Sequence, residues 1–313
     1  MIRKLPLPIA GLILGLAAGG NLILSYGSIY RNILGIVSGI FIMLLLIKIF
    51  AMPKSLKEGF DNPVVASVMP TFSMALMLLS TYFKPYFSSG AFLLWLIALA
   101  LHIVLMILFT VKYIINFNIK KVFPSYFVVY VGIVCASVTA PAFGMTQLGQ
   151  YIFWFGLAAY LILLPIAAYR VLAINEIPEP AMPTLTIFTA PASLCLTGYL
   201  NTFQNKNLYI VGFLAVLLLL MFIGTIVNMP RLLRLKFYPS YSAFTFPFVI
   251  TAIAMKGTNT YLLKTGTVIP FMDYFVNMLE LWAIAMVLYV LVRYVIYLSE
   301  GTKTAGVTAD AKD

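Results

Sequence analysis

The chain is 313 residues long with a formal net charge of +11, and 63% of its residues are hydrophobic whereas only 9% are charged. Because a soluble domain carries about 25% charged residues, this composition excludes a soluble globular protein. An α-helix needs roughly 20 apolar residues to cross the hydrocarbon core of a bilayer, so the chain has room for ten such helices and no soluble domain. We therefore predict an all-α integral membrane protein.

Ten apolar segments follow one another, separated by short basic or Gly/Pro-rich breaks. In chain order, the predicted spans cover about residues 6–26, 32–51, 63–82, 91–113, 124–142, 150–170, 183–202, 208–228, 239–256 and 268–299. The first segment has no small-residue cleavage pattern, so we expect a membrane helix and not a signal peptide. The prediction is one ten-helix transmembrane domain over residues 1–300 and a short cytoplasmic tail over residues 301–313.

The basic residues are distributed unevenly between the two ends of the spans. If the spans alternate in direction, 14 Lys and Arg residues lie on the side of the N-terminus and 5 lie on the other side. Those five are Arg31, Lys84, Lys206, Lys256 and Lys264. The positive-inside rule then predicts a multi-pass protein of a cytoplasmic membrane with both termini in the cytoplasm. The charge orients the chain and can attract anions or acidic membrane lipids, and we expect no nucleic-acid partner.

The odd-numbered spans share a pattern of residues that weaken a helix. The third, seventh and ninth spans open with a proline and carry a second proline seven or eight residues later, and in the fifth span a glycine takes the second position. These second positions are Pro70, Gly132, Pro191 and Pro247, and they lie 62, 59 and 56 residues apart. A nearly constant interval indicates a repeated unit, here a helical hairpin used five times.

A proline within a span removes one backbone hydrogen bond and kinks the helix. Lipid cannot satisfy the freed carbonyl, so such helices are expected where protein or a water-filled cavity can. We therefore predict five helical hairpins in a quasi-fivefold ring, with kinked inner helices lining a central pore and straighter even-numbered helices against lipid. The alternative is that these prolines are ordinary, since proline is common in transmembrane helices; their repetition at one offset favours the ring.

Three stretches of the chain carry a resemblance to a known family. They are Pro8–Asn21 in the first span, Pro183–Pro191 in the seventh and Pro239–Ile253 in the ninth. They resemble the tellurite-resistance/dicarboxylate transporter (TDT) family, which includes bacterial TehA-like proteins and the slow-type anion channels of plant guard cells. The resemblance covers nearly the whole chain. It implies a homotrimer with a pore in each protomer, five inner helices around that pore, and an occluding phenylalanine in the ninth span, which Phe246 matches.

Phe246 is also singled out by its position in the repeat. We call Pro70, Gly132, Pro191 and Pro247 the weak points of the repeat, and expect them at one depth in the membrane. The residues that precede them are Met69, Val131, Ala190 and Phe246. Only Phe246 is aromatic, so its ring could close a narrow lumen built from smaller groups, by dewetting and by occlusion. The alternative is that Phe246 packs between helices, as most aromatic residues of membrane proteins do.

The inner spans carry no charged side chain between their opening proline and their far end, which leaves small and hydroxyl-bearing residues as candidates for the pore lining. These candidates are Gly15, Thr71, Ser73, Ser193, Ser242 and Thr245. Such a lining binds ions weakly and lets them leave, which suits a conduit. The carbonyls four residues before the prolines, at Ala66, Ile187 and Ala243, are expected to be freed by the kinks and to be negative.

Besides the Lys and Arg residues that orient the chain, four ionisable residues lie within the even-numbered spans, namely His102, Asp273, Glu280 and Arg293. Ionisable residues inside a membrane often have a function. Asp273 and Arg293, however, lie near span ends where they can reach water. We expect His102 and Glu280 to have structural partners at a helix or subunit contact.

The remaining motifs indicate packing. Gly11, Gly15 and Gly19 form a small-residue stripe that permits close approach of another helix. Cys135 and Cys195 are expected to be buried free thiols. The sequence contains no metal-ligand cluster, nucleotide loop or nucleophile–base pair, so we expect no metal, no cofactor and no enzymatic activity.

Two functions remain open. The first is a passive anion channel for small monovalent anions such as chloride or nitrate, with a homotrimeric assembly and Phe246 as its gate. The second is a carrier for C4-dicarboxylates or for an oxyanion such as tellurite, coupled to protons. The uncharged inner spans favour the channel, because proton-coupled carriers usually need buried ionisable groups in the pathway.

Overall fold

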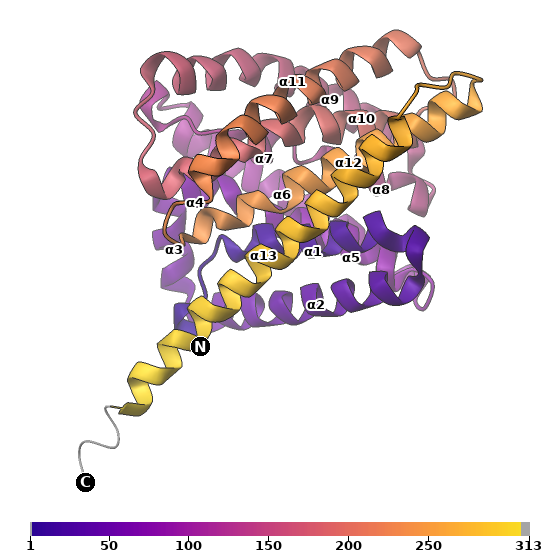
Figure 1. Cartoon of the computed structure of the whole chain (residues 1–313). Coiled ribbons are helices and arrows are strands. Elements are labelled where there is room, and N and C mark those ends of the chain that lie inside the picture. Colours follow the sequence, from indigo (N-terminus) through magenta and orange to yellow (C-terminus); the bar gives the residue numbers. More distant parts are fainter. Residues whose placement is uncertain (1, 308–313) are drawn as a thin grey trace.

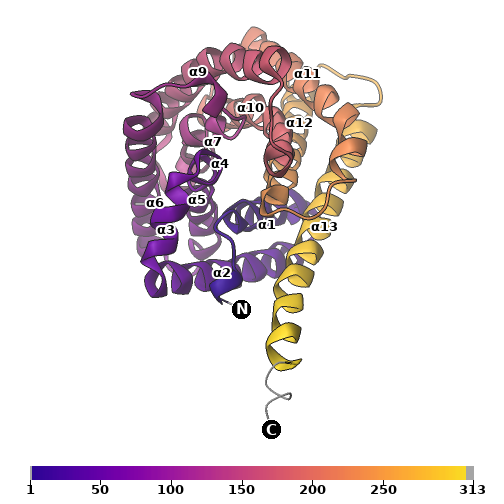
Figure 2. The same ribbon diagram turned by 90° about the vertical axis from the view of Figure 1, so that its left-hand side faces the viewer.

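The computed structural model describes residues 2–307, and every regular element within that range is a helix. The prediction of an all-α protein is confirmed. The helices form two layers around a common axis, as seen along that axis in Figure 2. Both ends of the described chain lie at the same end of the molecule, at the left in Figure 1.

The outer layer consists of five long helices. They are α2 (Ser28–Ala51), α6 (Ser88–Phe109), α9 (Thr146–Tyr169), α11 (Leu208–Leu232) and α13 (Met272–Val307), and Figure 2 shows them surrounding the other elements. In the apolar windows of these helices, only 17% to 39% of the residues are buried. Most of their apolar side chains therefore face outwards, as expected for helices in contact with lipid.

The inner layer is made of shorter pieces. In chain order these are α1 (Ile9–Leu22), α4 (Pro63–Val68) with α5 (Thr71–Phe83), α7 (Tyr126–Tyr130) with α8 (Val134–Thr139), the 3-10 helix η7 (Glu179–Thr189) with α10 (Ala190–Thr202), and the 3-10 helix η8 (Pro239–Phe244) with α12 (Phe246–Lys264). The windows that cover α1 and α4–α5 are each 72% buried. The core of the protein therefore lies in this layer.

Short helices complete the chain. They are η1 (Ile2–Lys4), η2 (Ile23–Tyr26), α3 (Pro53–Asp61), η3 (Thr110–Ile114), η4 (Ile119–Lys121), η5 (Ala140–Phe143) and η6 (Arg170–Ile174). The helix α3 falls between two predicted spans, where its charged residues interrupt the apolar pattern. Its charged and apolar residues alternate at helical spacing, which is typical of a helix at a membrane surface.

The four weak points of the repeat lie at junctions between helical pieces. Pro70 separates α4 from α5, Gly132 separates α7 from α8, and Pro191 and Pro247 lie in the first turns of α10 and α12. Proline supplies no N–H at such a junction. At Gly132, a Cβ atom would overlap the carbonyl oxygen of Val128, so glycine alone allows this turn.

The carbonyls that were expected to be free are occupied, and that expectation is wrong. The oxygen of Ala66 accepts from the N–H of Met69 at 3.3 Å, that of Ile187 accepts from the N–H of Ala190, and that of Ala243 accepts from Thr186 Oγ1 at 2.6 Å. Two of the three are satisfied by i→i+3 bonds of the 3-10 type, which tighten the backbone where an α-helical bond is missing. The lumen therefore gains no negative charge from these groups.

Within the described residues, seven helices are long and apolar enough to cross a membrane by themselves. The other three predicted spans, 124–142, 183–202 and 239–256, consist of shorter pieces joined at the breaks, so a count of ten membrane-spanning segments stays a prediction. The boundaries also differ: α12 continues beyond residue 256 to Lys264, and α13 continues beyond residue 300 to Val307. The rest of the predicted tail, residues 308–313, lies outside the described range.

Candidate functional site

A small cavity lies at the centre of the inner layer, and all five inner segments contribute to its wall. Its volume is about 40 Å³, and its lining includes Gly11, Thr71, Val128, Gly132, Pro191 and Pro247. Three of the four weak points thus line one cavity, and Thr71 follows the fourth, Pro70, directly. The cavity lies at the level where the inner helices are interrupted.

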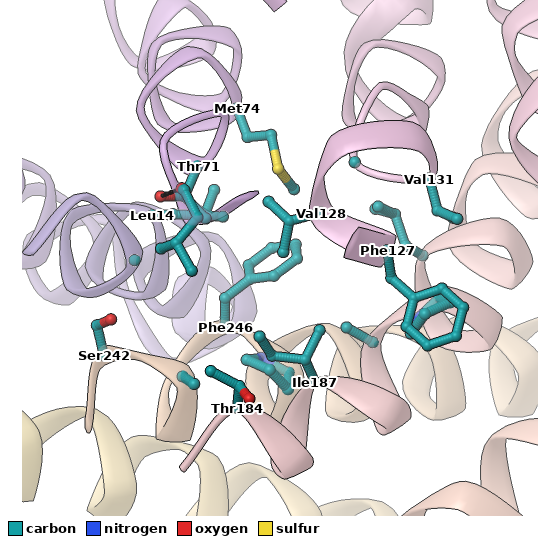
Figure 3. A pocket seen from close by; sticks show the side chains of 18 of the residues that line it. Leu14, Thr71, Met74, Phe127, Val128, Val131, Thr184, Ile187, Ser242 and Phe246 are labelled. Carbon is teal, nitrogen blue, oxygen red and sulfur yellow. Dashed lines mark hydrogen bonds between the residues drawn. The ribbon is translucent and has the colours of Figure 1, made fainter. Parts of the chain in front are cut away.

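The ring of Phe246 occupies the middle of this region. It projects from the start of α12 toward Val128 on α7 (Figure 3), and the residue is only 6% exposed. The residue before it, Thr245, is held by hydrogen bonding to two neighbouring segments. Its Oγ1 atom lies 3.0 Å from the carbonyl oxygen of Gly11 and 2.7 Å from that of Ser242, and its proton can be donated to either. The backbone that carries the ring is therefore tied to α1 and to η8.

A second cavity lies beyond the ring. It has a volume of about 280 Å³, and its lining includes Asn21, Thr81, Asn201 and Ile253, from the C-terminal parts of the inner helices. The first cavity, in contrast, reaches residues that precede the breaks, such as Thr184 and Ser240. Phe246 and Leu194 belong to both linings, so these two side chains separate the cavities.

A third cavity opens at the end of the molecule opposite the termini. Its volume is about 590 Å³, and its lining includes Lys206, Lys256 and Lys264. It shares Asn21, Leu24, Asn201 and Ile253 with the second cavity. A row of adjoining cavities therefore leads from this end of the molecule to the Phe246 ring.

The family assignment agrees with this architecture. A family model described as voltage-dependent anion channel, SLAC1, matches residues 6–295. The chain belongs to this anion channel family. No curated protein matches it.

Membership of the SLAC1 family confirms the resemblance of the sequence to the TDT family and has three coarse consequences. The chain is a multi-pass membrane protein, its function is that of an anion channel or transporter, and the family is not one of enzymes. Anions are accordingly its substrates.

In this SLAC1 family member, the six predicted pore-lining residues divide into two groups. Thr71 and Ser242 line the central cavity. Ser73, Ser193 and Thr245 lie outside the cavity linings, since their hydroxyl groups are turned toward the protein. Ser73 Oγ lies 2.8 Å from the carbonyl oxygen of Pro70, Ser193 Oγ lies 2.6 Å from that of Thr189, and Thr245 bonds as described above. Hydroxyl groups near the breaks thus form hydrogen bonds with carbonyl oxygens of the interrupted backbone.

Gly15, the sixth candidate, also lies outside the cavity linings and is a packing residue. A Cβ atom at this position would overlap the side chain of Thr245 and come within 3.2 Å of the backbone nitrogen of Phe246. A Cβ at Gly11 would likewise lie 2.9 Å from Ser242 Oγ. The glycines of α1 therefore allow it to lie directly against the segment that carries the ring.

The ionisable residues of the outer helices have partners within the chain. His102 is fully buried, with Nδ1 at 2.9 Å from Ser73 Oγ and Nε2 at 3.1 Å from the carbonyl oxygen of Val129. Glu280 accepts from Lys256 Nζ at 2.6 Å and from Tyr26 Oη at 2.7 Å. Both residues thus have the helix contacts that were expected of them.

The other ionisable and thiol groups have ordinary surroundings. Asp273 accepts from Asn259 Nδ2 at 2.6 Å, and the Arg293 guanidinium lies 5.8 Å from the Phe237 ring centre. Cys135 and Cys195 are free and buried. In the described part of the chain, no group of His, Cys, Asp and Glu residues could hold a metal ion.

Two features of the site were not predicted. Leu194, which separates the cavities together with Phe246, follows Pro191 within an apolar helix that offers no signal for it. The second feature is the gathering of lysines at the open end, since the sequence linked these residues only to the orientation of the chain. Lys256, Thr260 and Lys264 are spaced by four residues and all line the third cavity; this helical spacing was the signal that could have grouped them.

Proposed function

We propose that the protein is an anion channel that conducts small monovalent anions, such as chloride and nitrate, through a pore in each protomer. In this proposal the ring of Phe246 occludes the pore. The observation that supports it best is that one aromatic side chain belongs to the linings of two cavities on a common path. An apolar ring at such a constriction blocks ions by occlusion and by excluding water.

The chemistry of the path favours a channel over a proton-coupled carrier. Among the described residues that line the two cavities beside the ring, none is Asp, Glu, His, Lys or Arg. His102, the single histidine of the chain, bonds to Ser73 and Val129 and lies outside those linings. A coupled carrier usually needs such groups in the pathway to take up and release protons.

Assembly and orientation belong to the same proposal. We expect a homotrimer in a bacterial inner membrane, with both termini in the cytoplasm. The uneven distribution of Lys and Arg supports the orientation, and both ends of the described chain lie at the same end of the molecule. The exposed apolar side chains of the outer helices, for example Ile36 and Ile162, each 64% exposed, are available to lipid or to a neighbouring subunit.

The gate is tested by shortening Phe246. Phe246→Ala should raise anion flux into liposomes at a set membrane potential by at least about tenfold, because the barrier at the constriction is removed. Phe246→Leu should raise it less, since a smaller apolar group remains. If Phe246 only packed between helices, the Ala variant would instead lose about 3–5 kcal/mol of stability and open nothing.

Phe248→Ala is the matched control. Phe248 lies on the same helix, is 1% exposed, and packs against Phe222 and Trp282, away from the cavity linings. It should lose stability without gaining flux. A folded Phe246→Ala protein that is no more conductive than the parent contradicts the gate.

The carrier alternative is tested in the same liposomes. Uptake of malate or tellurite that depends on an imposed proton gradient would favour the carrier. Nitrate flux that follows the membrane potential alone, and is unchanged by the proton gradient, supports the channel.

A further inference from the structure

The third cavity holds a concentration of positive charge at the open end of the path. We propose that this mouth is an anion-binding vestibule in which Lys206, Lys256 and Lys264 hold a small inorganic anion before it reaches Phe246, and in which Glu280 sets the strength of binding. The inference rests on the proposed channel function, because it adds an entry site to that path. It assigns a role to the three lysines and to the buried Glu280.

Two of the lysines carry charge that no described carboxylate neutralises. Within the described residues, neither Lys206 nor Lys264 lies within ion-pair distance of an Asp or Glu side chain. Lys206 Nζ lies 5.9 Å from the centre of the Tyr261 ring, and Tyr261 Oη lies 3.3 Å from the Lys206 carbonyl oxygen, to which it donates. The half-buried Lys206 side chain is thus positioned over the ring. Like charges around a concave surface raise the local concentration of anions.

The third lysine is neutralised, and its partner is buried. Lys256 Nζ donates to Glu280 Oε1 at 2.6 Å and to Ser25 Oγ at 2.8 Å, and lies 3.4 Å from the Leu22 carbonyl oxygen. The Glu280 side chain is 5% exposed, whereas that of Lys256 is 36% exposed toward the cavity. The positive charge of Lys256 at the vestibule is therefore neutralised by the buried carboxylate of Glu280. Removing that carboxylate would leave the charge of Lys256 unneutralised.

The route inward continues from the lysines with amide groups. Asn21 lines both the vestibule and the second cavity. Its Oδ1 atom accepts from Arg31 Nε at 2.9 Å, so the amide N–H₂ half of the side chain remains for an anion. Lys256 follows Phe246 by ten positions on α12, a rise of about 15 Å, so an anion at the vestibule lies well outside the gate.

The first experiment measures conductance at low and high salt in planar bilayers, with every variant made in the Phe246→Ala protein, in which the proposed gate is open. The double variant Lys206→Gln/Lys264→Gln should pass less nitrate entering from the vestibule side, by about twofold per lysine at 10 mM salt and hardly less at 1 M, where the Debye length is about 3 Å. Glu280→Gln should raise the low-salt conductance by about the same factor. Lys84→Gln is the matched control, because Lys84 is predicted to face the same side of the membrane and does not line the cavity. Equal effects of Lys84→Gln and the double variant would overturn the vestibule, as would effects that persist at 1 M salt.

The second experiment needs no current. Purified protein is treated with an amine-acetylating reagent in nitrate or in gluconate at equal ionic strength, and modification of each lysine is read by mass spectrometry. Nitrate should slow acetylation of Lys206 and Lys264 at least about threefold more than that of Lys84, and the difference should grow in Glu280→Gln. If nitrate slows acetylation of these lysines but Phe246→Ala shows no anion flux, the vestibule is supported and the proposed channel is rejected. Absence of any selective protection rejects the vestibule whatever the flux.

Discussion

Gly15 constrains the position of Phe246 through the contact of α1 with Thr245. A Cβ atom there would overlap Thr245, whose hydroxyl group bonds to Gly11 and Ser242 and so cannot swing aside freely. Gly15→Ala should therefore overpack the contact between α1 and the start of α12 and cost about 1–3 kcal/mol. The expected result is a lower unfolding temperature of the purified protein in detergent.

Gly39→Ala provides the comparison for that measurement. Gly39 lies on the outer helix α2, and a Cβ at this position would meet nothing within 4 Å. It should leave the unfolding temperature unchanged or raise it slightly, since alanine favours helix over glycine by about 1 kcal/mol. If both variants unfold at the same temperature as the parent, α1 does not support the ring in the way described.

His102 connects three elements, since it extends from α6 to Ser73 on α5 and to the carbonyl oxygen of Val129 on α7. That carbonyl can only accept, so Nε2 carries the proton and donates it. Ser73 has one hydroxyl proton, which the Nδ1 atom of His102 at 2.9 Å and the Pro70 carbonyl oxygen at 2.8 Å share as acceptors. His102→Phe keeps the volume but leaves these buried polar groups without their partner. We expect a loss of about 1–3 kcal/mol in stability.

The matching variant is Ser73→Ala. Because both changes remove the same hydrogen bond, the double variant should lose less stability than the sum of the single ones. Nitrate flux per folded protein should stay near that of the parent in all three, since His102 is absent from the cavity linings. Loss of flux in a stable His102→Phe protein would instead support a proton-coupled carrier.

The repeat in the sequence predicts where the inner helices are interrupted better than it predicts which side chains face the cavities. Prolines are visible in a sequence, so the junctions at Pro191 and Pro247 could be foreseen. The direction of a side chain at a break depends on the local 3-10 geometry, and the sequence does not determine it. For this reason Ser193 and Thr245 were expected in the lining, whereas their hydroxyl groups bond to the backbone. Phe246 was found by its motif, but the cavities on its two sides depend on five segments far apart in the chain.

At the scale of the whole molecule, the path combines a charged mouth with an apolar interior. The cavities beside Phe246 are lined by uncharged side chains, so an anion that enters them must give up part of its hydration without direct compensation from a cation. Weakly hydrated anions should therefore permeate most easily, with nitrate and bromide ahead of chloride and with sulfate and malate behind. Reversal potentials of Phe246→Ala under bi-ionic conditions measure this order. Sulfate or malate ahead of nitrate would contradict the proposed channel.

The breaks in the inner helices also place new helix beginnings around one point. The helices α5, α10 and α12 start at Thr71, Ala190 and Phe246, and all three residues line the central cavity. The amino end of a helix carries roughly half a positive charge. Three such ends around one cavity give the interior a positive field that belongs to the backbone. A preference for anions over cations can then persist across pH and cannot be removed by changing any single side chain.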